Sequence, residues 1–248
     1  MTKKFIVVTT ALIIAITSCK ISSGEFRSVK FYYKFQFMQI DPNRLIDYYD
    51  STEVFQYQDY IIYRDPYINS KTIINMNKKG ETLSEESNTE VKHQYIIYKL
   101  GSQRIKVYSS LKDTIGIDSN LNQFLTNNSL FRQNLVTSIP EKHKLIIAKG
   151  NLRVYQYTGI KKDVTYYDTA YLYFDRRFKE APFSISLRID SAFNRKLAKV
   201  RYIFNPTQQD NIMIPRREFL FELRPTDPYN YEDLKSLVKR YQKSKSKD

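Results

Sequence analysis

The feature that most constrains the fold is a stretch of strict alternation close to the N-terminus. Every second position there is Val29, Phe31, Tyr33, Phe35 or Phe37, and Lys, Tyr or Gln side chains stand between them. Successive side chains of a β-strand point to opposite faces, so this pattern predicts a strand with one buried and one solvated face. Such a strand needs partners for its backbone, and the stretch therefore predicts a sheet.

Similar β-rich stretches follow along most of the chain, separated by Gly, Pro, Asp or Asn. The predicted strands are Val54–Arg64, Ile68–Asn75, Val91–Leu100, Gln103–Ser109, Leu145–Lys149, Leu152–Thr158, Val164–Asp175, Phe183–Asp190, Lys199–Asn205 and Glu218–Arg224. Many short strands at regular spacing favour a β-dominated α+β fold. We expect an antiparallel sheet, curved or closed halfway into a barrel.

Three other segments have helical features, and a fourth segment is polar. We expect a short helix over Asn43–Tyr49, a helix with Leu121, Phe124 and Leu125 that Asp118 or Ser119 caps, a closing helix over Asn230–Tyr241, and an exposed loop over Glu81–Glu90. The closing helix has apolar residues at helical spacing, and Asn230 is its expected N-cap. The sequence therefore predicts two or three helices, one of them C-terminal.

The N-terminal segment has the parts of a secretory signal peptide. Two lysines give a positive start, an apolar run extends from Phe5 to Ile16, and two small residues follow. The run is shorter than the ~20 apolar residues that a membrane-spanning helix needs. Residues 1–18 are therefore predicted to be a signal peptide.

The exit from this segment, Ile16-Thr17-Ser18-Cys19, resembles the lipobox of bacterial lipoproteins, with Ile16 where Leu is more usual. The resemblance implies that the thiol of Cys19 is alkylated with diacylglycerol and that the peptide is cut just before it. Further acyl chains such as palmitate would make the attachment to the lipid bilayer effectively permanent. Cys19 is the only cysteine, so the fold has no disulfide.

The residues after Cys19 indicate where such a lipoprotein would reside. Lys20 replaces the Asp that tends to retain lipoproteins at the inner membrane, and residues 20–24 lack an acidic cluster of the kind that directs some lipoproteins to the surface. The resemblance therefore implies an outer-membrane protein that faces the periplasm. We expect residues 19–25 to be a lipidated tether, 26–241 a single β-rich periplasmic domain, and 242–248 a basic tail.

The formal charge of +14 bears on possible partners. In a cytoplasmic protein it would favour nucleic-acid binding, but export removes that opportunity, so no nucleic-acid partner is expected. Part of the charge lies in the C-terminal tail, which is either a solvated end or a contact for anionic lipid headgroups.

The chain has few groups that could carry catalysis. Neither His93 nor His143 has a second ligand at metal-binding spacing, and the sequence contains no nucleophile elbow, P-loop or dinucleotide fingerprint. Neither a metal nor a cofactor is expected. Carboxylates at strand ends (Asp59, Asp65, Asp163, Asp168, Asp175 and Asp190) leave a carboxylate-dependent hydrolase as the least favoured alternative, because Asp is also a common turn residue. The chain is not expected to be an enzyme.

Three short motifs resemble the Asp-Ser/Thr-apolar acceptor pattern for O-glycosylation in some bacterial envelope proteins. Their acceptors would be Thr114, Thr169 and Ser191. The same Asp-Thr and Asp-Ser pairs are ordinary turn and cap residues, so both interpretations stay open.

The aromatic content, 21 Tyr and 15 Phe without Trp, leads to the functional expectation. Phe31, Tyr33, Phe35 and Phe37 are either core residues or the wall of a site for an apolar or lipid ligand. The predicted function is that of a non-enzymatic binding or assembly module in the envelope. The alternative, a lipoprotein that binds an envelope protein partner, predicts an exposed aromatic patch or a long unpaired strand.

Overall fold

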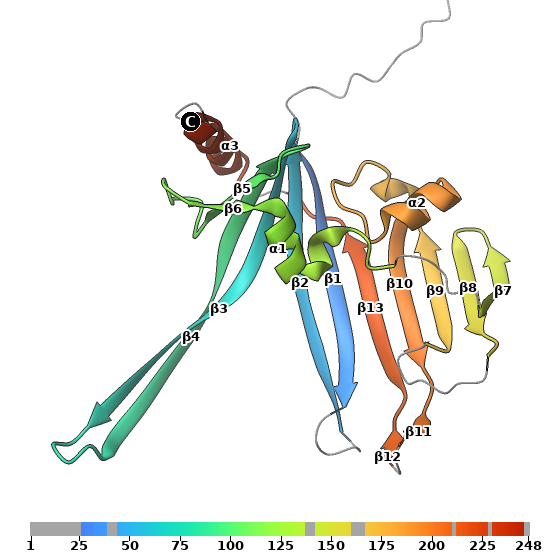
Figure 1. Cartoon of the computed structure of the whole chain (residues 1–248), viewed down its shortest axis with the longest axis horizontal. Helices are drawn as coiled ribbons and strands as arrows, with labels where there is room; N and C mark the ends of the chain where they lie inside the picture. Colours follow the sequence, from blue (N-terminus) through green and yellow to red (C-terminus); the bar gives the residue numbers. More distant parts are fainter. Residues whose placement is uncertain are drawn as a thin grey trace, which may run out of the picture.

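The computed structural model describes residues 26–38, 44–136, 142–159, 167–209, 212–227 and 230–245. Figure 1 shows a large twisted sheet, short helices over part of it, and a long two-stranded arm that extends away from it. The strands are β1 (Arg27–Met38), β2 (Leu45–Tyr57), β3 (Tyr60–Met76), β4 (Thr82–Lys99), β5 (Arg104–Tyr108), β6 (Ile117–Asn120), β7 (His143–Lys149), β8 (Leu152–Tyr157), β9 (Thr169–Phe174), β10 (Leu197–Phe204), β11 (Thr207–Gln209), β12 (Ile212–Ile214) and β13 (Arg217–Arg224). The helices are α1 (Leu121–Asn127), α2 (Leu187–Phe193) and α3 (Tyr231–Lys245), with 3-10 turns η1 (Ser129–Arg132) and η2 (Arg176–Phe178).

Eleven of these strands form one antiparallel sheet with the order β6-β5-β4-β3-β2-β1-β13-β10-β9-β8-β7. Two runs of consecutive strands meet in the middle, where β13 returns to pair with both β1 and β10. The register places Phe31 opposite Leu223 and Phe35 opposite Phe219. The sheet is open, with β6 and β7 at its two edges.

The direction of β1 defines two ends of the molecule. The proximal end holds the start of β1 at Arg27, together with η2, α2 and α3 (Figure 1). The distal end holds the end of β1, the start of β2 and the tip of the β3–β4 hairpin.

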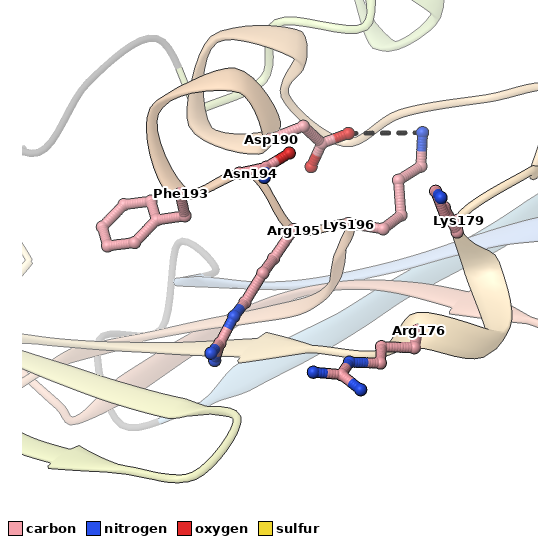
Figure 2. Close-up of a pocket in the computed structure, with 7 residues that line it drawn as sticks. All are labelled: Arg176, Lys179, Asp190, Phe193, Asn194, Arg195 and Lys196. Carbon is pink, nitrogen blue, oxygen red and sulfur yellow. Dashed lines mark ion pairs between the residues drawn. The ribbon is translucent and has the colours of Figure 1, made fainter. Parts of the chain in front are cut away.

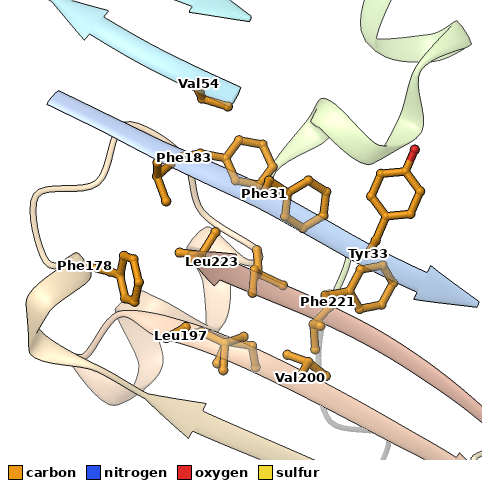
Figure 3. Packing of buried hydrophobic residues seen from close by; sticks show 14 of the residues in the cluster. Phe31, Tyr33, Val54, Phe178, Phe183, Leu197, Val200, Phe221 and Leu223 are labelled. Atoms are coloured by element: carbon orange, nitrogen blue, oxygen red, sulfur yellow. The ribbon is translucent and has the colours of Figure 1, made fainter. Parts of the chain in front are cut away.

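The larger core lies on the face of the sheet that carries the alternating side chains of β1, which we call the front face. Phe31 is fully buried there, with its ring 4.8 Å from that of Phe183 and 6.4 Å from that of Phe221. The segments between β6 and β7 and between β9 and β10 cover this part of the sheet and contribute Phe131 and Ile189. Figure 3 shows Phe183, from the second of these segments, beside Phe31. From Val29 to Tyr33 the alternation of β1 is therefore an alternation between core and solvent, as predicted, whereas Phe35 is half-buried and Phe37 is exposed.

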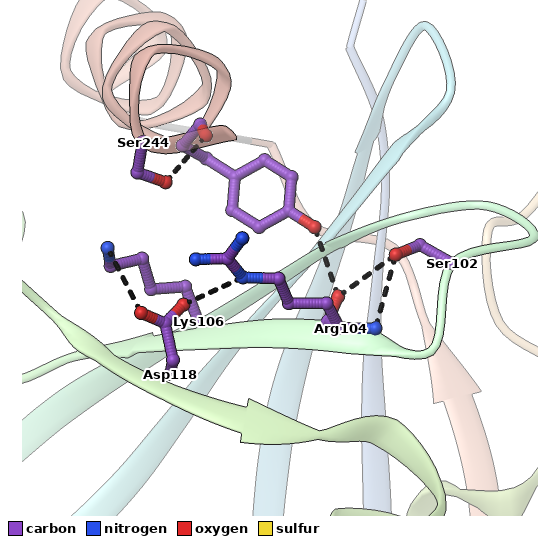
Figure 4. A network of polar contacts seen from close by, with 6 residues as sticks. Ser102, Arg104, Lys106, Asp118 and Ser244 are labelled. Atoms are coloured by element: carbon purple, nitrogen blue, oxygen red, sulfur yellow. Dashed lines mark hydrogen bonds and ion pairs between the residues drawn. The ribbon is translucent and has the colours of Figure 1, made fainter. Parts of the chain in front are cut away.

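A smaller core lies on the back face, where α3 packs against β2–β5. Leu237 and Tyr241 of α3 are almost fully buried against Phe55, Ile62 and Tyr108. The Tyr241 hydroxyl donates a hydrogen bond of 3.0 Å to the backbone carbonyl of Arg104 (Figure 4). The predicted C-terminal helix is thus a structural element of the sheet, and it continues past Tyr241 to Lys245.

The predicted fold class is confirmed: the protein is a β-dominated α+β structure with an antiparallel sheet and three α-helices, one of them C-terminal. The expected hairpin through Gly101-Ser102 is present as β4 and β5. Val54–Arg64 was predicted as one strand but contains the turn between β2 and β3, where Gln58 adopts a positive φ of 54°.

Several predicted local structures are wrong. The helix predicted over Asn43–Tyr49 is not present in its described part, because residues from Leu45 onward pair with β1 as part of β2; Asn43 lies outside the described residues. Glu81–Glu90 is exposed, but nearly all of it is strand and not loop: residues 82–90 belong to β4, whose backbone pairs with β3. Its polarity reflects the absence of a buried face rather than the absence of a strand.

Two further local predictions are also wrong, one of a strand and one of a helix cap. Phe183–Asp190 was expected to be a strand, yet α2 begins at Leu187 because the Ser186 side chain caps it by accepting the Ile189 N–H. The helix that begins at Leu121 is capped by Asn120, not by Asp118 or Ser119. Both errors arise because Ser, Asn and Asp suit caps and turns equally well.

Candidate functional site

Among the described residues, helical segments cover the front face of the sheet at the proximal end but not at the distal end. Helical segments lie over the upper part of β1 and β2, and these strands continue below them (Figure 1). An apolar surface is exposed on this lower part. We call it the aromatic patch; it consists of Phe35, Phe37, Ile46, Tyr48 and Phe219.

Strand register brings the members of the aromatic patch together. Phe37 and Ile46 are direct cross-strand partners, as are Phe35 and Tyr48. The ring of Phe35 lies 5.8 Å from that of Phe37 and 5.1 Å from that of Phe219. These distances are typical of aromatic pairs, so the patch is a preformed cluster rather than a set of scattered side chains.

The outer members of the patch are strongly exposed. Phe37, Ile46 and Tyr48 have exposed fractions of 46%, 42% and 51%. Single exposed apolar residues are normal on protein surfaces, so the contiguous grouping on one sheet face is what makes this surface a candidate site.

Polar groups border the patch on β2 and β3. The Tyr33 hydroxyl lies 3.5 Å from a carboxylate oxygen of Asp50. Asp65 accepts hydrogen bonds from Thr52, at 3.1 Å, and from Gln94, at 3.0 Å. Burial is the largest influence on the Asp65 carboxyl and raises its pKa above the usual value, against the opposing effect of these hydrogen bonds. An apolar centre with a polar rim is the anatomy of a protein–protein interface.

The long β3–β4 hairpin is the second exposed feature at the distal end. β2 pairs with β3 as far as Arg64, and β5 pairs with β4 only from Tyr95 onward. Among the described strands, the remainder of the hairpin pairs only with itself; we call this part the ribbon (65–76 and 82–94). Such an isolated two-stranded unit is marginally stable in water, and its outer edges carry unpaired backbone groups.

One face of the ribbon carries no charge over most of its length. Ile68 is opposite Val91, and both side chains are strongly exposed, at 72% and 65%. The next pairs on this face are hydroxyl pairs, such as Ser70 and Thr89 at 3.3 Å. By strand alternation this face continues the back of the sheet, so it lies on the side opposite to the aromatic patch.

The back face of the other half of the sheet has a different character. Cross-strand ion pairs cover β10 and β13, including Lys199–Glu222 at 3.2 Å and Arg201–Glu218 at 2.7 Å. Because these charges already have partners, this surface is a solvated face of the sheet rather than a site.

A basic hollow lies at the proximal end, between η2 and the end of α2. It has a volume of about 780 Å³ and is lined by Arg176, Lys179, Asp190, Phe193, Asn194, Arg195 and Lys196 (Figure 2). Its one carboxylate, Asp190, pairs with Lys196 at 3.2 Å. The hollow therefore offers cationic groups to an anion.

The aromatic residues predicted from the alternation have different environments. Phe31 and Tyr33 are core residues, Phe35 is half-buried, and Phe37 is exposed. The lipidation candidate Cys19 lies outside the described residues.

The predicted O-glycosylation acceptors occupy separate places. Thr114 is exposed in the loop before β6, Ser191 is exposed on α2, and Thr169 is half-buried at the start of β9. The preceding Asp113 accepts backbone hydrogen bonds within its own loop, and Asp190 of α2 accepts the N–H of Leu197 at the start of β10, so both have structural roles.

Sequence reasoning missed most of the distal surface. Ile46 and Tyr48 fell within the segment that was expected to be helical, and Phe219 was treated as one position of a late strand. The usable signal was weak: aromatic and β-branched residues are frequent from Tyr48 through Phe55, but Asp50, Ser51 and Glu53 interrupt them, and only pairing with β1 shows that β2 is continuous.

Asp163 lies outside the described residues, and most of the described carboxylates named from the sequence have separate partners. Asp168 accepts the Asn205 N–H at 2.6 Å, and Asp175 pairs with Arg177 at 2.7 Å beside η2. Within the described residues, no group of three or more His, Cys, Asp or Glu side chains could hold a metal ion. None of the helices in that part of the chain is long and apolar enough to span a membrane.

Comparison with known proteins identifies no relative: no protein-family model matches the chain, and no curated protein matches it.

Proposed function

We propose that the chain is a membrane-anchored envelope lipoprotein, not an enzyme, that binds a protein partner through the aromatic patch. The partner would present an apolar surface to the rings and hydrogen-bond donors to the carboxylates at the rim. The exposed aromatic patch is the observation that carries this proposal.

The position of the patch supports it. Phe37 is ten residues after Arg27 on β1, which corresponds to about 33 Å along the strand. An anchor at Cys19 would precede the proximal end of the sheet. The patch would then be held away from the membrane, where a periplasmic partner could reach it.

The alternative of an apolar small-molecule ligand has less support. Of the four residues predicted to line such a site, Phe31 and Tyr33 are buried in the core, Phe35 is half-buried and Phe37 is exposed. An apolar hollow between β2, β4 and α3, lined in part by Phe55, Tyr95 and Leu234, has a volume of only about 10 Å³. That is no more than the space a single water molecule needs.

A photo-crosslinking amino acid at Tyr48 tests partner binding in intact cells. A matched control replaces Tyr231, which has a similar exposed fraction (45% against 51%) but lies on α3 at the proximal end. We expect a defined crosslinked protein from position 48 that is absent from position 231 and weakened by Phe37→Ser. The same diffuse set of neighbours from both positions would refute a specific partner at the patch.

The anchor has a test of its own. We expect the wild-type chain to incorporate labelled palmitate and the Cys19→Ala variant to lose the label. Continued incorporation by the variant would show that Cys19 is not the acylated residue, whatever the crosslinking result.

A further inference from the structure

We propose that the basic hollow at the proximal end binds the phosphate groups of anionic lipids in the membrane to which the chain is anchored. This inference rests on the proposed anchor at Cys19. It adds an orientation: the proximal end lies against the headgroups and the aromatic patch points away from them.

The hollow has cations without matching anions. Arg176, Lys179 and Arg195 are all exposed, and none forms an ion pair with a carboxylate among the described residues. Arg195 is oriented by a hydrogen bond of 3.2 Å from its guanidinium to the carbonyl of Gly150. Figure 2 shows the guanidinium groups of Arg176 and Arg195 on the side of the hollow away from Asp190.

The single carboxylate does not neutralise these three cations. Asp190 accepts hydrogen bonds from the Ser184 hydroxyl and the Leu197 N–H, each at 2.7 Å, and pairs with Lys196. Its acceptor capacity is thus used within the fold. The remaining groups suit phosphate oxygens, because guanidinium groups donate paired hydrogen bonds to such anions.

The hollow is next to the point where the chain leads back to Cys19. Arg27, at the start of β1, pairs at 3.2 Å with Glu180, which directly follows Lys179. The seven residues from 19 to 25 can extend over at most about 25 Å. An acylated Cys19 would therefore keep the hollow near the anionic surface, where basic groups are attracted to the headgroups.

The ribbon and the turn that joins its two strands (77–81) offer a matched control for net charge. Lys71, Lys78 and Lys79 are exposed cations at the distal end, which the proposed orientation places far from the membrane. Replacing them removes as much positive charge as replacing Arg176, Lys179 and Arg195. Any difference between the two triple variants must then come from position and not from net charge.

The test uses the full acylated chain in vesicles with spin-labelled headgroups, made of phosphatidylcholine alone or mixed equally with phosphatidylglycerol. With Cys19 acylated, a fluorophore on Ser191→Cys (proximal) or Ser87→Cys (ribbon) labels a single site. In the anionic vesicles we expect strong quenching at position 191 and weak quenching at position 87. The R176Q/K179Q/R195Q variant should lose this difference in quenching between the two positions. The K71Q/K78Q/K79Q variant should retain the difference.

Three outcomes would overturn the proposal: equal quenching at both positions, no dependence on phosphatidylglycerol, or unchanged quenching in R176Q/K179Q/R195Q.

Inorganic phosphate and chloride, added at equal ionic strength, distinguish binding of a lipid headgroup from binding of a free anion. Headgroup binding predicts the same loss of quenching with both salts, whereas selective displacement by phosphate would show a small-anion site instead. Mass spectrometry measures the acylation of the chain independently of the quenching. The chain without lipid can also be added to the same vesicles from solution, so that binding by the hollow is measured without the anchor. Failure of the anchor is therefore distinguishable from failure of the hollow.

Discussion

Phe31 and Phe37 point to the same face of one strand, yet Phe31 is fully buried and Phe37 is 46% exposed. The difference arises from what covers the strand. At the proximal end, the segments that carry Phe131 and Phe183 fill the space over the sheet, whereas the described chain leaves the rings at the distal end open to solvent. Identical alternation thus produces a structural core at one end of β1 and a candidate binding surface at the other.

The sharpest test of this comparison replaces each phenylalanine by alanine. Phe31→Ala should lower the free energy of unfolding by about 3–5 kcal/mol, because it leaves a cavity in a filled core. Phe37→Ala should change it by less than about 1 kcal/mol, since the ring is already partly solvated. Urea unfolding measures both values, and comparable losses would show that the patch is part of the core.

The back face provides a second test. Leu237 of α3 is fully buried between the helix and the sheet. Leu237→Ala should therefore lower the free energy of unfolding by about 3 kcal/mol and release the helix from β2–β5. Lys239→Ala, at an exposed position of the same helix, serves as the control and should have little effect. If circular dichroism and urea unfolding show the two variants to be equally stable, α3 does not hold the sheet as described.

The pH dependence of stability should differ between the loop under α3, which contains Asp113, and the root of the ribbon, which contains His93. Backbone N–H groups of Ser109, Ile115 and Gly116 hold the Asp113 carboxylate, with that of Ser109 the largest influence, and lower its pKa to about 2. The folded-state pKa lies below the unfolded one, so this stabilisation is present above about pH 4 and is lost as the pH falls towards 2.

Asp113→Asn should therefore destabilise the protein at neutral pH by about 1 kcal/mol, the typical net contribution of a hydrogen bond. The gap from the wild type should close in acid. Thermal unfolding between pH 2 and pH 7 measures it, and a constant difference over this range would contradict the assignment.

Of these groups, His93 should have the smallest effect on stability, and that effect should occur at a higher pH than the effect of Asp113. It lies at the root of the ribbon, 3.3 Å from the Arg64 guanidinium. Burial first, and then the charge of Arg64, lower its pKa below 6.5. The folded state therefore binds fewer protons at this group than the unfolded state, and stability falls as the pH drops below about 6.5.

In the His93→Gln variant this loss should disappear. Hydrogen exchange of the ribbon amides at pH 7.5 and pH 5 measures it: opening should increase in acid for the wild type and change less for the variant. If the wild-type ribbon shows no such increase, His93 does not control its root.

Much of the fold could be predicted from local pattern, and the failures have a common cause. The alternation of β1 and the apolar spacing of α3 report one-sided burial, which side-chain period reveals directly. The ribbon has no buried face, so residues 81–90 resemble a loop although residues 84–90 pair continuously with β3. Residues 183–190 contain apolar side chains that suit a strand, and only the cap at Ser186 turns the chain into α2.

The sequence by itself determined the class of fold, the apolar face of each well-patterned element, and the resemblance of residues 1–19 to a lipoprotein leader. Tertiary structure alone decided which of the aromatic side chains became core and which became surface. It also assembled the basic hollow from η2 and α2 and brought it next to Arg27. The physical reason is that periodicity describes one element at a time, whereas burial and charge neutralisation depend on which distant segments the chain places over it.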